Sequence, residues 1–592
     1  MRENIGPIAR GTALILTFCG LLLTSENAFG AGGSCPSGAS YLTTTGTLTT
    51  LSNLGVTSCY YIAANGSDSN NGTSELTPWL HAPAMPNCSG NCATLQASMK
   101  SAGGGGLGFI FRGGDTWHFG DNTKTPYTGG QWGFNNVPIS GKSGSPIYLG
   151  VDPSWYSGSS WARPILTYDN PANSSQTLSS CPIPTPGNMI DISGQKYFII
   201  DNFEMTGICT TSSFWNAIYV NYGSMSGYAN FYNLYIHGWS HVGFPSVQDC
   251  TTNSTCMSAF RGSVITGPPY DTLLYDVVDG SDSDPVPMEF CYCGAWHVAN
   301  SYFNNGSQFI TRSQNSFHDS SILNFANNGH ANVMESTGDV PGPSNAYAIY
   351  NNVFAHLYIG SKLTSNVCFW PYPPVGATLY WFNNVVYDIG PCELFNGGEN
   401  GANQGTVARF NDTFQNNHRP DGLTQGFSCS ATGNSAPYED SNIHFISDEA
   451  TSLSALYSSS CSGQGTNAST LLMTNSVATS DGYTSSETYA FSPPSSSSPT
   501  VGAGTNEGSA NNAYCSALST AANADSFLSD AAAACLNDTR YACTYSSTNH
   551  TLTCPARTAL ARPSSGKWDI GAYQSGDPAP PQPPTNVQAT AH

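Results

Sequence analysis

A polar residue set between two β-prone runs recurs through the middle of the chain and constrains the fold more than any other feature. Two examples are Phe198-Ile-Ile-Asp-Asn202-Phe-Glu and Trp381-Phe-Asn-Asn384-Val-Val. The polar residues recur at intervals of 21 to 43 positions, at Asn202, Asn233, Asp276, Asn300, Ser321, Asn352, Asn384 and Asp412. This spacing predicts a solenoid in which every turn adds one strand to the same sheet.

The polar position within the repeat predicts a ladder inside the solenoid. An inward amide can hydrogen-bond to its counterpart one turn above and below, which satisfies a group that is costly to bury alone. The alternative is that asparagine only marks turns, but a turn residue is not expected at a fixed offset between two apolar runs. We therefore expect Asn233, Asn300, Asn352 and Asn384 to form one vertical file.

Composition narrows the class of protein further. Only 9% of the 592 residues are charged and 12% are aromatic, which excludes a disordered chain and a long coiled coil. The net charge of −21 would repel a polyanion, so we expect no nucleic-acid partner. A chain of this length forms several domains unless it is a repeat array, and the repeat favours a single array.

Several segments resemble a known superfamily. They are Asn65-Gly-Ser-Asp-Ser-Asn-Asn-Gly-Thr before Pro78-Trp79, Phe111-Arg-Gly-Gly-Asp-Thr-Trp117, Gly144-Ser-Pro-Ile-Tyr and Trp568-Asp-Ile-Gly-Ala-Tyr-Gln574. Residues 58–575 resemble secreted proteins of the pectate-lyase-like superfamily. The resemblance implies an all-β fold, a single-stranded right-handed parallel β-helix (solenoid) with long corner loops.

The resemblance leaves the chemistry open. The superfamily includes lyases, hydrolases, epimerases and non-catalytic binding or attachment proteins. The Asn-Thr-Asp, Gly-Asp-Asp, Gly-His-Gly and Arg-x-Lys motifs of polygalacturonase-type hydrolases do not occur in this sequence. The arginine motifs of the best-known pectate lyases and the Lys-plus-Arg motifs of chondroitinase-like lyases are not recognisable either.

The N-terminal segment of the sequence predicts export. Arg2 and Arg10 precede an apolar run over residues 12–23, and Ala28-Phe29-Gly30 follows as a cleavage site, so residues 1–30 are predicted to be a signal peptide. The run is too short to span a bilayer, and we expect a secreted monomer without membrane insertion. We expect residues 31–58 to cover the first coil, residues 59–575 to form the β-helix with irregular late coils and a cap, and residues 576–592 to form a Pro-rich tail.

Cysteine usage agrees with an oxidising compartment. Cys19 leaves with the signal peptide, and the other 18 of the 19 cysteines form an even set. We predict local disulfides between sequence neighbours, namely Cys88–Cys92, Cys250–Cys256, Cys368–Cys392, Cys515–Cys535 and Cys543–Cys554. A zinc site at Cys291, Cys293 and His297 is disfavoured, because no second ligand pair lies at usable spacing.

Charged residues are scarce, so those that recur in successive coils are informative. Ahead of the ladder strands stand Arg261, Glu289, Arg312, Glu335 and Lys362. Such a set predicts a groove for an anionic sugar, although a one-residue slip in register would turn any of them to the other face. The alternative is an ion-pair ladder of little energetic value.

The predicted chemistry is β-elimination from a uronic-acid polymer. This reaction needs a cation for the substrate carboxylate, a base for the C5 proton and an acid for the leaving oxygen. Arg312 and Lys362 suit carboxylate binding, Lys362 with a depressed pKa suits the base, and His330 is the alternative base. Arg261, Trp370 and Tyr372 are the candidates for substrate binding.

A metal ion is a further expectation. Asp279, Asp282 and Asp284 place three carboxylates at near-alternating positions around a glycine, a set that suits calcium. The alternative is a solvated acidic turn. His237, His241, His318 and His356 lie at coil edges, where structural roles are expected for them.

Three functional hypotheses follow. The first is a polysaccharide lyase acting on an acidic glycan, with a polysaccharide as its partner. The second is a non-catalytic glycan-binding or structural β-helix. The third is a glycoside hydrolase that uses Glu289 and Glu335 as its acid and base.

Overall fold

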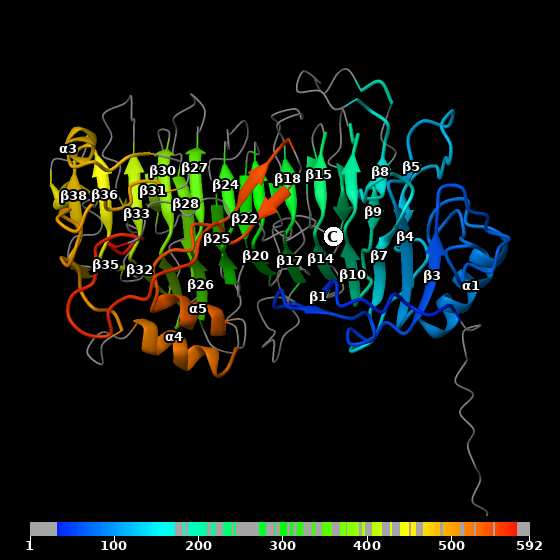
Figure 1. Cartoon of the computed structure of the whole chain (residues 1–592), viewed down its shortest axis with the longest axis horizontal. Coiled ribbons are helices and arrows are strands. Elements are labelled where there is room, and N and C mark those ends of the chain that lie inside the picture. Colours follow the sequence, from blue (N-terminus) through cyan, green and yellow to red (C-terminus); the bar gives the residue numbers. More distant parts are fainter. Residues whose placement is uncertain are drawn as a thin grey trace, which may run out of the picture.

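A computed structural model describes most of the chain, and the described segments build one long β-helix (Figure 1). The described residues are 32–171, 181–183, 187–209, 215–219, 229–238, 242–243, 271–279, 289–290, 296–304, 308–311, 316–323, 334–337, 346–357, 367–373, 376–389, 393–396, 405–416, 427–428, 438–448, 452–456, 466–485, 489–508, 514–525, 528–548 and 551–576.

Parallel strands form three long sheets along one axis (Figure 1). Within the described residues, the first sheet has 13 strands: β3 (Ser58–Ile62), β4 (Leu107–Gly113), β7 (Ile147–Tyr156), β10 (Phe198–Asp201), β14 (Ala229–Tyr232), β17 (Asp271–Leu274), β20 (Trp296–Ala299), β23 (Ser316–His318), β26 (Ala346–Tyr350), β29 (Thr378–Phe382), β32 (Thr406–Phe410), β35 (Tyr438–Ser441) and β37 (Thr466–Ala468).

The second sheet has 12 described strands: β5 (Thr116–His118), β8 (Ile165–Thr167), β11 (Glu204–Thr206), β15 (Tyr235–His237), β18 (Val277–Asp279), β21 (Tyr302–Asn304), β24 (Ser321–Leu323), β27 (Val353–Leu357), β30 (Val385–Ile389), β33 (Thr413–Asn416), β36 (His444–Ser447) and β38 (Leu471–Met473). The third sheet has six: β19 (Glu289–Phe290), β22 (Gln308–Thr311), β25 (Met334–Thr337), β28 (Val367–Tyr372), β31 (Glu393–Asn396) and β34 (Phe427–Ser428).

Shorter elements complete the described secondary structure. Two further parallel groups are β6 (Trp132–Gly133), β9 (Ile190–Asp191) and β13 (Ile218–Tyr219), and β12 (Trp215–Asn216) with β16 (Val242–Gly243). Antiparallel pairs join β1 (Tyr41–Leu42) to β2 (Leu48–Thr49) and β39 (Thr544–Ser546) to β40 (Thr551–Thr553). The helices are α1 (Gly90–Ala102), η1 (Leu453–Leu456), α3 (Asn475–Ser480), α4 (Tyr514–Ala522) and α5 (Ser529–Cys535).

Among the described residues, six successive coils from β17 to β34 place one strand in each long sheet. For example, the chain passes from β26 through β27 and β28 to β29, which pairs in parallel with β26. This confirms the predicted single-stranded right-handed parallel β-helix.

The predicted polar file is in fact two adjacent files at the corner between the first and second sheets. Asn202, Asn233, Asn300, Asn351 and Asn383 occupy equivalent corner positions with positive φ, where asparagine is better tolerated than most residues. From Asp276 onward, the next position forms the internal ladder of Asp276, Ser301, Ser320, Asn352, Asn384 and Asp412. The predicted single file was therefore wrong by one residue at Asn202, Asn233, Asn300 and Ser321. Asparagine suits both the corner position and the ladder position, for different reasons.

The ladder runs in one direction along the corner. The side-chain oxygen of Asn384 accepts a bond from the backbone N–H of Asn352 at 3.0 Å, and Asp412 accepts from Asn384 at 2.7 Å. Burial raises the pKa of Asp276 and of Asp412 well above the ordinary value. Both carboxyls therefore favour the neutral form, which resembles the asparagine of neighbouring coils.

The interior of the β-helix is filled by stacked apolar side chains. One file in the first sheet runs through Phe109, Leu149, Ile200, Phe231, Val298, Phe317, Ile349 and Trp381. Its next two positions are Arg409 and Asp440, which form a buried two-bond ion pair with N–O distances of 2.7 and 2.8 Å. Pairing makes it tolerable to bury charge there.

Segments from both ends of the sequence cover the outer face of the first sheet. Residues 41–56, here called the N-terminal cover, bury Tyr41, Leu42 and Leu51 against it. Helices α4 and α5 with residues 536–540, here called the C-terminal cover, lie over its later strands (Figure 1). An aromatic stack runs along those strands into α4, with neighbouring rings 4.6 to 5.0 Å apart, through His318, Tyr350, Phe382, Phe410 and Tyr514.

The second sheet is covered as well. Tyr489, Phe491, Tyr541 and Tyr573 pack on the outer side of its later strands, and the β39–β40 hairpin reaches Tyr235 in β15. The C-terminal segment therefore runs back along the β-helix, from α4 beside β32 to the β39–β40 hairpin beside β15. Two short helices, α4 and α5, begin this returning segment.

Five disulfides lie within the described residues: Cys35–Cys59, Cys88–Cys92, Cys181–Cys209, Cys515–Cys535 and Cys543–Cys554. Three were predicted, and all five join consecutive cysteines. The predicted pairs Cys250–Cys256 and Cys368–Cys392, like residues 1–31 and 577–592, lie outside what the structure describes. None of the described helices is long and apolar enough to cross a membrane.

Candidate functional site

Three predicted site residues fall together on the third sheet. In the pairing of β25 with β28, Glu335 stands opposite Trp370 and Thr337 stands opposite Tyr372. Phe369, which directly precedes Trp370, is buried in the core against Phe354 and Trp381, with ring centroids 4.9 and 5.0 Å away. Because neighbouring positions of a strand belong to opposite faces, positions 335, 370 and 372 share the outer face.

Glu289 lies on the same face but in a different file. It pairs with Gln308, whereas Glu335 pairs with Ile310, two residues further along β22. Two strands and two residues therefore separate the backbones of the glutamates, a distance of roughly 12 Å. The file of Glu335 continues through Trp370 and Asn396 to Ser428.

The other predicted site residues are placed only in part. Asp279 ends β18, in register with His237 and Asn304. Arg261, Asp282, Asp284, Arg312, His330, Lys362 and His241 lie outside the described residues. Their roles remain predictions.

The predicted structural histidines have carboxylate partners. His237 Nε2 lies 3.1 Å from Glu204 Oε1, and His356 Nδ1 lies 2.7 Å from Asp388 Oδ2. His318 belongs to a larger cluster at the corner between the first and second sheets.

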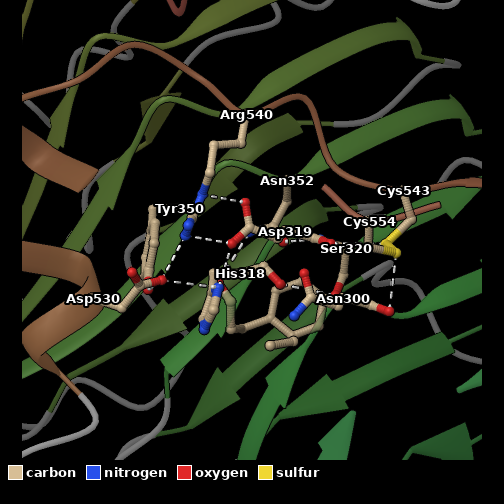
Figure 2. A network of polar contacts seen from close by, with 12 residues as sticks. Asn300, His318, Asp319, Ser320, Tyr350, Asn352, Asp530, Arg540, Cys543 and Cys554 are labelled. Carbon is tan, nitrogen blue, oxygen red and sulfur yellow. Dashed lines mark hydrogen bonds and ion pairs between the residues drawn. A yellow bond between two sulfur atoms is a disulfide. The ribbon is translucent and has the colours of Figure 1, made fainter. Parts of the chain in front are cut away.

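This corner cluster joins three distant parts of the chain (Figure 2). His318, at the end of β23, places Nδ1 2.6 Å from Asp319 Oδ2 and 3.8 Å from Asp530 Oδ2 in α5. Arg540 donates Nε to Asp319 Oδ1 at 3.0 Å and Nη2 to Asp530 Oδ2 at 2.5 Å. Tyr350 donates its hydroxyl to Asp530 at 3.2 Å.

The electrostatics of the cluster follow from this geometry. Partial burial acts to raise the pKa of Asp530, but His318 and Arg540 together hold it below its ordinary value. Burial acts to lower the pKa of Arg540, and Asp319 and Asp530 reverse this and raise it. Next to the cluster, burial and then His318 lower the pKa of His297 well below the ordinary value.

The cluster also has the donor set of a possible metal site. His318, Asp319 and Asp530 offer one nitrogen and two oxygen atoms that all lie within 4.8 Å of one another. The Arg540 guanidinium already bonds to both carboxylates, so it supplies the positive charge that an ion would bring. A metal ion would have to displace Arg540 or share the carboxylates with it.

The disulfide of the hairpin lies beside this cluster. Cys543 contacts the Asp319 carbonyl at 3.0 Å, and Cys554 contacts the Asn300 carbonyl at 3.1 Å (Figure 2). Both carbonyls belong to corner residues with positive φ. Sequence reasoning missed Asp530 and Arg540, because 221 residues separate Arg540 from Asp319 and no local pattern marks the contact.

The strand topology decides the fold type. The chain is a single-stranded right-handed parallel β-helix. No protein-family model matches the sequence, and the comparison with curated proteins gives no significant match.

Solved structures with a similar fold include carbohydrate-active proteins. Pectate lyase Pel9A matches with 15% identity and a TM-score of 0.36, over 87% of this chain and 96% of that protein. A GH136 lacto-N-biosidase from Eubacterium ramulus matches with 10% identity and a TM-score of 0.40, over 70% and 68%. A rhamnogalacturonan lyase matches with 13% identity and a TM-score of 0.35, over 65% and 87%. At these identities the likeness concerns the fold alone.

Proposed function

We propose that the protein is an exported carbohydrate-active β-helix, and specifically a polysaccharide lyase that acts on a uronate-containing glycan by β-elimination. The substrate would lie along the outer face of the third sheet. The observation that carries the proposal is the register that groups Glu335 with Trp370 and Tyr372 on that face. A carboxylate beside aromatic positions suits a sugar polymer, whose rings stack on aromatic side chains.

The covered outer faces of the first and second sheets support placing the substrate on the third sheet. Among the side chains that the structure describes, the N-terminal and C-terminal covers and the hairpin pack on the outer sides of the first and second sheets. In the third sheet the structure describes the side chain of Phe369, which packs into the core. We place a long substrate on the outer face of the third sheet because the outer faces of the other two sheets are covered where their side chains are described.

In this proposal the reaction removes the C5 proton and breaks the C4–O bond. Lys362 or His330 takes the proton, the leaving oxygen gains one, and a C4–C5 double bond forms. Arg312 and Arg261 neutralise substrate carboxylates, and Trp370 and Tyr372 stack on the rings. Calcium at Asp279, Asp282 and Asp284 would bridge protein and substrate. The cluster around His318 is not proposed for calcium, since calcium prefers oxygen ligands and Arg540 already bonds to both carboxylates.

A product assay tests the proposal. The full-length protein is incubated with a panel of acidic polysaccharides, with and without a chelator, while the ultraviolet absorbance of unsaturated uronate is followed. We expect absorbance to rise and to be lost in Lys362→Ala or His330→Ala, with the thermal unfolding unchanged. Trp370→Ala should raise KM more than it lowers kcat, because it removes binding surface.

The other outcomes identify the alternatives. New reducing ends without absorbance would favour a glycoside hydrolase, and Glu289→Gln and Glu335→Gln would then each abolish it. Retention of glycan without any product would favour a non-catalytic binding protein. Unchanged turnover in both Lys362→Ala and His330→Ala would remove the site assignment.

A further inference from the structure

A buried arginine in an earlier coil, at the same corner of the β-helix as the His318 cluster, lacks an acidic partner. Arg163 precedes β8, and only 8% of its surface is exposed. Its Nε donates to the Asn233 carbonyl at 3.0 Å, across two coils. No residue that the structure describes accepts a hydrogen bond from its Nη1 or Nη2, and no described carboxylate forms an ion pair with it within 4.0 Å.

The carboxylates around this guanidinium are held by other groups. Glu204 pairs with His237 at 3.1 Å. Asp201 accepts bonds from the Tyr148 hydroxyl at 2.9 Å and from the Asn233 amide at 2.8 Å. These acids act on Arg163 only from a distance, and burial lowers the pKa of its guanidinium. An arginine stays protonated in proteins, so this charge is left without a close counter-ion.

Aromatic residues flank the guanidinium. Its central carbon lies 6.0 Å from the Trp161 ring centroid. The indole N–H of Trp161 is buried and has no hydrogen-bond partner either. Tyr545, from the β39–β40 hairpin, is close enough to act on Arg163 electrostatically, and its ring packs 5.0 Å from Tyr302.

Two parallel N–H donors on one guanidinium match the two oxygens of a carboxylate. Aromatic rings beside such a fork suit the apolar face of a sugar. We propose that this corner, formed by Trp161, Arg163 and the β39–β40 hairpin, is a second carbohydrate site that binds the carboxylate of one acidic sugar through Arg163 Nη1 and Nη2. It lies on the corner between the first and second sheets, away from the third sheet.

Calorimetric titration of the full-length protein with D-galacturonate tests this site. Galactose serves as the neutral control, and acetate and sulfate serve as the small anions. We expect galacturonate to bind, galactose not to bind, and Arg163→Gln to weaken galacturonate binding about tenfold or more. Arg163→Lys keeps the charge and the aliphatic stem but loses the paired N–H donors of the guanidinium, so it should also weaken binding. This variant replaces Arg163→Gln in the test if Arg163→Gln does not fold.

Two control measurements distinguish binding at Arg163 from the proposed lyase activity on the third sheet. Trp370→Ala and Glu335→Gln alter the third sheet and should leave galacturonate binding at Arg163 unchanged. Thermal unfolding without ligand should be unchanged or raised in Arg163→Gln, since the variant removes an uncompensated buried charge. The proposal would be overturned if galacturonate does not bind or if its binding does not depend on Arg163. It would also be overturned if acetate or sulfate binds as strongly as galacturonate.

Discussion

The same sheet is covered in two different ways at its two ends. The N-terminal cover lies on the first sheet through apolar contacts, with Leu51 fully buried and Cys35–Cys59 as a tether. The C-terminal cover adds a charged clamp, in which Arg540 bridges Asp319 of the β-helix and Asp530 of α5. The difference teaches that a cover segment is held by directional bonds at a solenoid corner rich in polar groups, whereas on a flat apolar face buried area is enough.

Buried arginines mark the C-terminal region more widely. Arg557 and Asp538 form a fully buried ion pair with an N–O distance of 3.0 Å. Arg562 donates to the Asn383 side chain and to the Gly571 carbonyl, each at 3.1 Å. Only 17 lysines and arginines occur in the chain, so their concentration here is informative. The C-terminal region therefore depends on paired charges more than the N-terminal cover does, and its salt response is expected at the partly exposed Arg540.

The largest expected effect is in the N-terminal cover. Leu51→Ala should lower the free energy of unfolding of this cover by about 2–5 kcal/mol, because it removes buried apolar surface and leaves a cavity. Hydrogen exchange of residues 41–56 measures the change. Leu48→Ala is the matched control, since 58% of the Leu48 surface is exposed. Equal losses for both variants, or a strong dependence of the Leu51→Ala effect on salt, would contradict the apolar account.

A smaller effect is expected at the clamp. Arg540→Met keeps the stem but leaves Asp319 and Asp530 without their cation, and should cost about 1–3 kcal/mol in the C-terminal cover. High salt should shrink the difference from the wild type, because screening weakens partly exposed ion pairs. Exchange of residues 514–535 at low and high salt reports it, with Arg540→Lys as the control that keeps the charge. A salt-independent loss that Arg540→Lys fails to reduce would show that packing, not charge, matters there.

The smallest effect is the response of the two covers to acid. Burial raises the pKa of Asp201, beneath the N-terminal cover, to about 6 from an ordinary value of 3.8. The folded form therefore binds the proton more tightly than the unfolded form, so stability falls as pH rises from 3.8 to 6 and returns on acidification. The pKa of Asp530 is shifted down, and its contribution is complete above pH 3.8 and lost below it.

Hydrogen exchange at three pH values separates the two responses. Between pH 6.5 and 4, residues 41–56 should gain protection. Between pH 4 and 3, residues 514–535 should lose protection as Asp530 is protonated. Protection of residues 41–56 that falls in the first step, or protection of residues 514–535 that is unchanged in the second, would contradict the assignment.

Much of the fold could be predicted because a solenoid repeats the same local residue pattern in each coil. The alternation of apolar residues around one polar position fixed the strand of each coil, and cysteines close in sequence formed local disulfides. The ladder was misplaced by one residue at Asn233 and Asn300 because asparagine suits both the positive-φ corner and the ladder position beside it. The arrangement of the candidate residues on the third sheet was harder to predict, since the register that brings Glu335 beside Trp370 and shifts Glu289 by two residues depends on the length of each corner loop.

By itself, the sequence determined that each coil adds one strand to the same sheet around an apolar interior, because every coil repeats the same residue pattern. Only the tertiary structure decided which faces are covered, that Arg540 meets Asp319 from 221 residues away, and that Arg163 lies at a corner without an acidic partner. The reason is physical: strand pairing in a solenoid joins neighbouring coils and leaves a periodic trace. A contact between a distant segment and one face occurs once, so no repeated sequence pattern marks it.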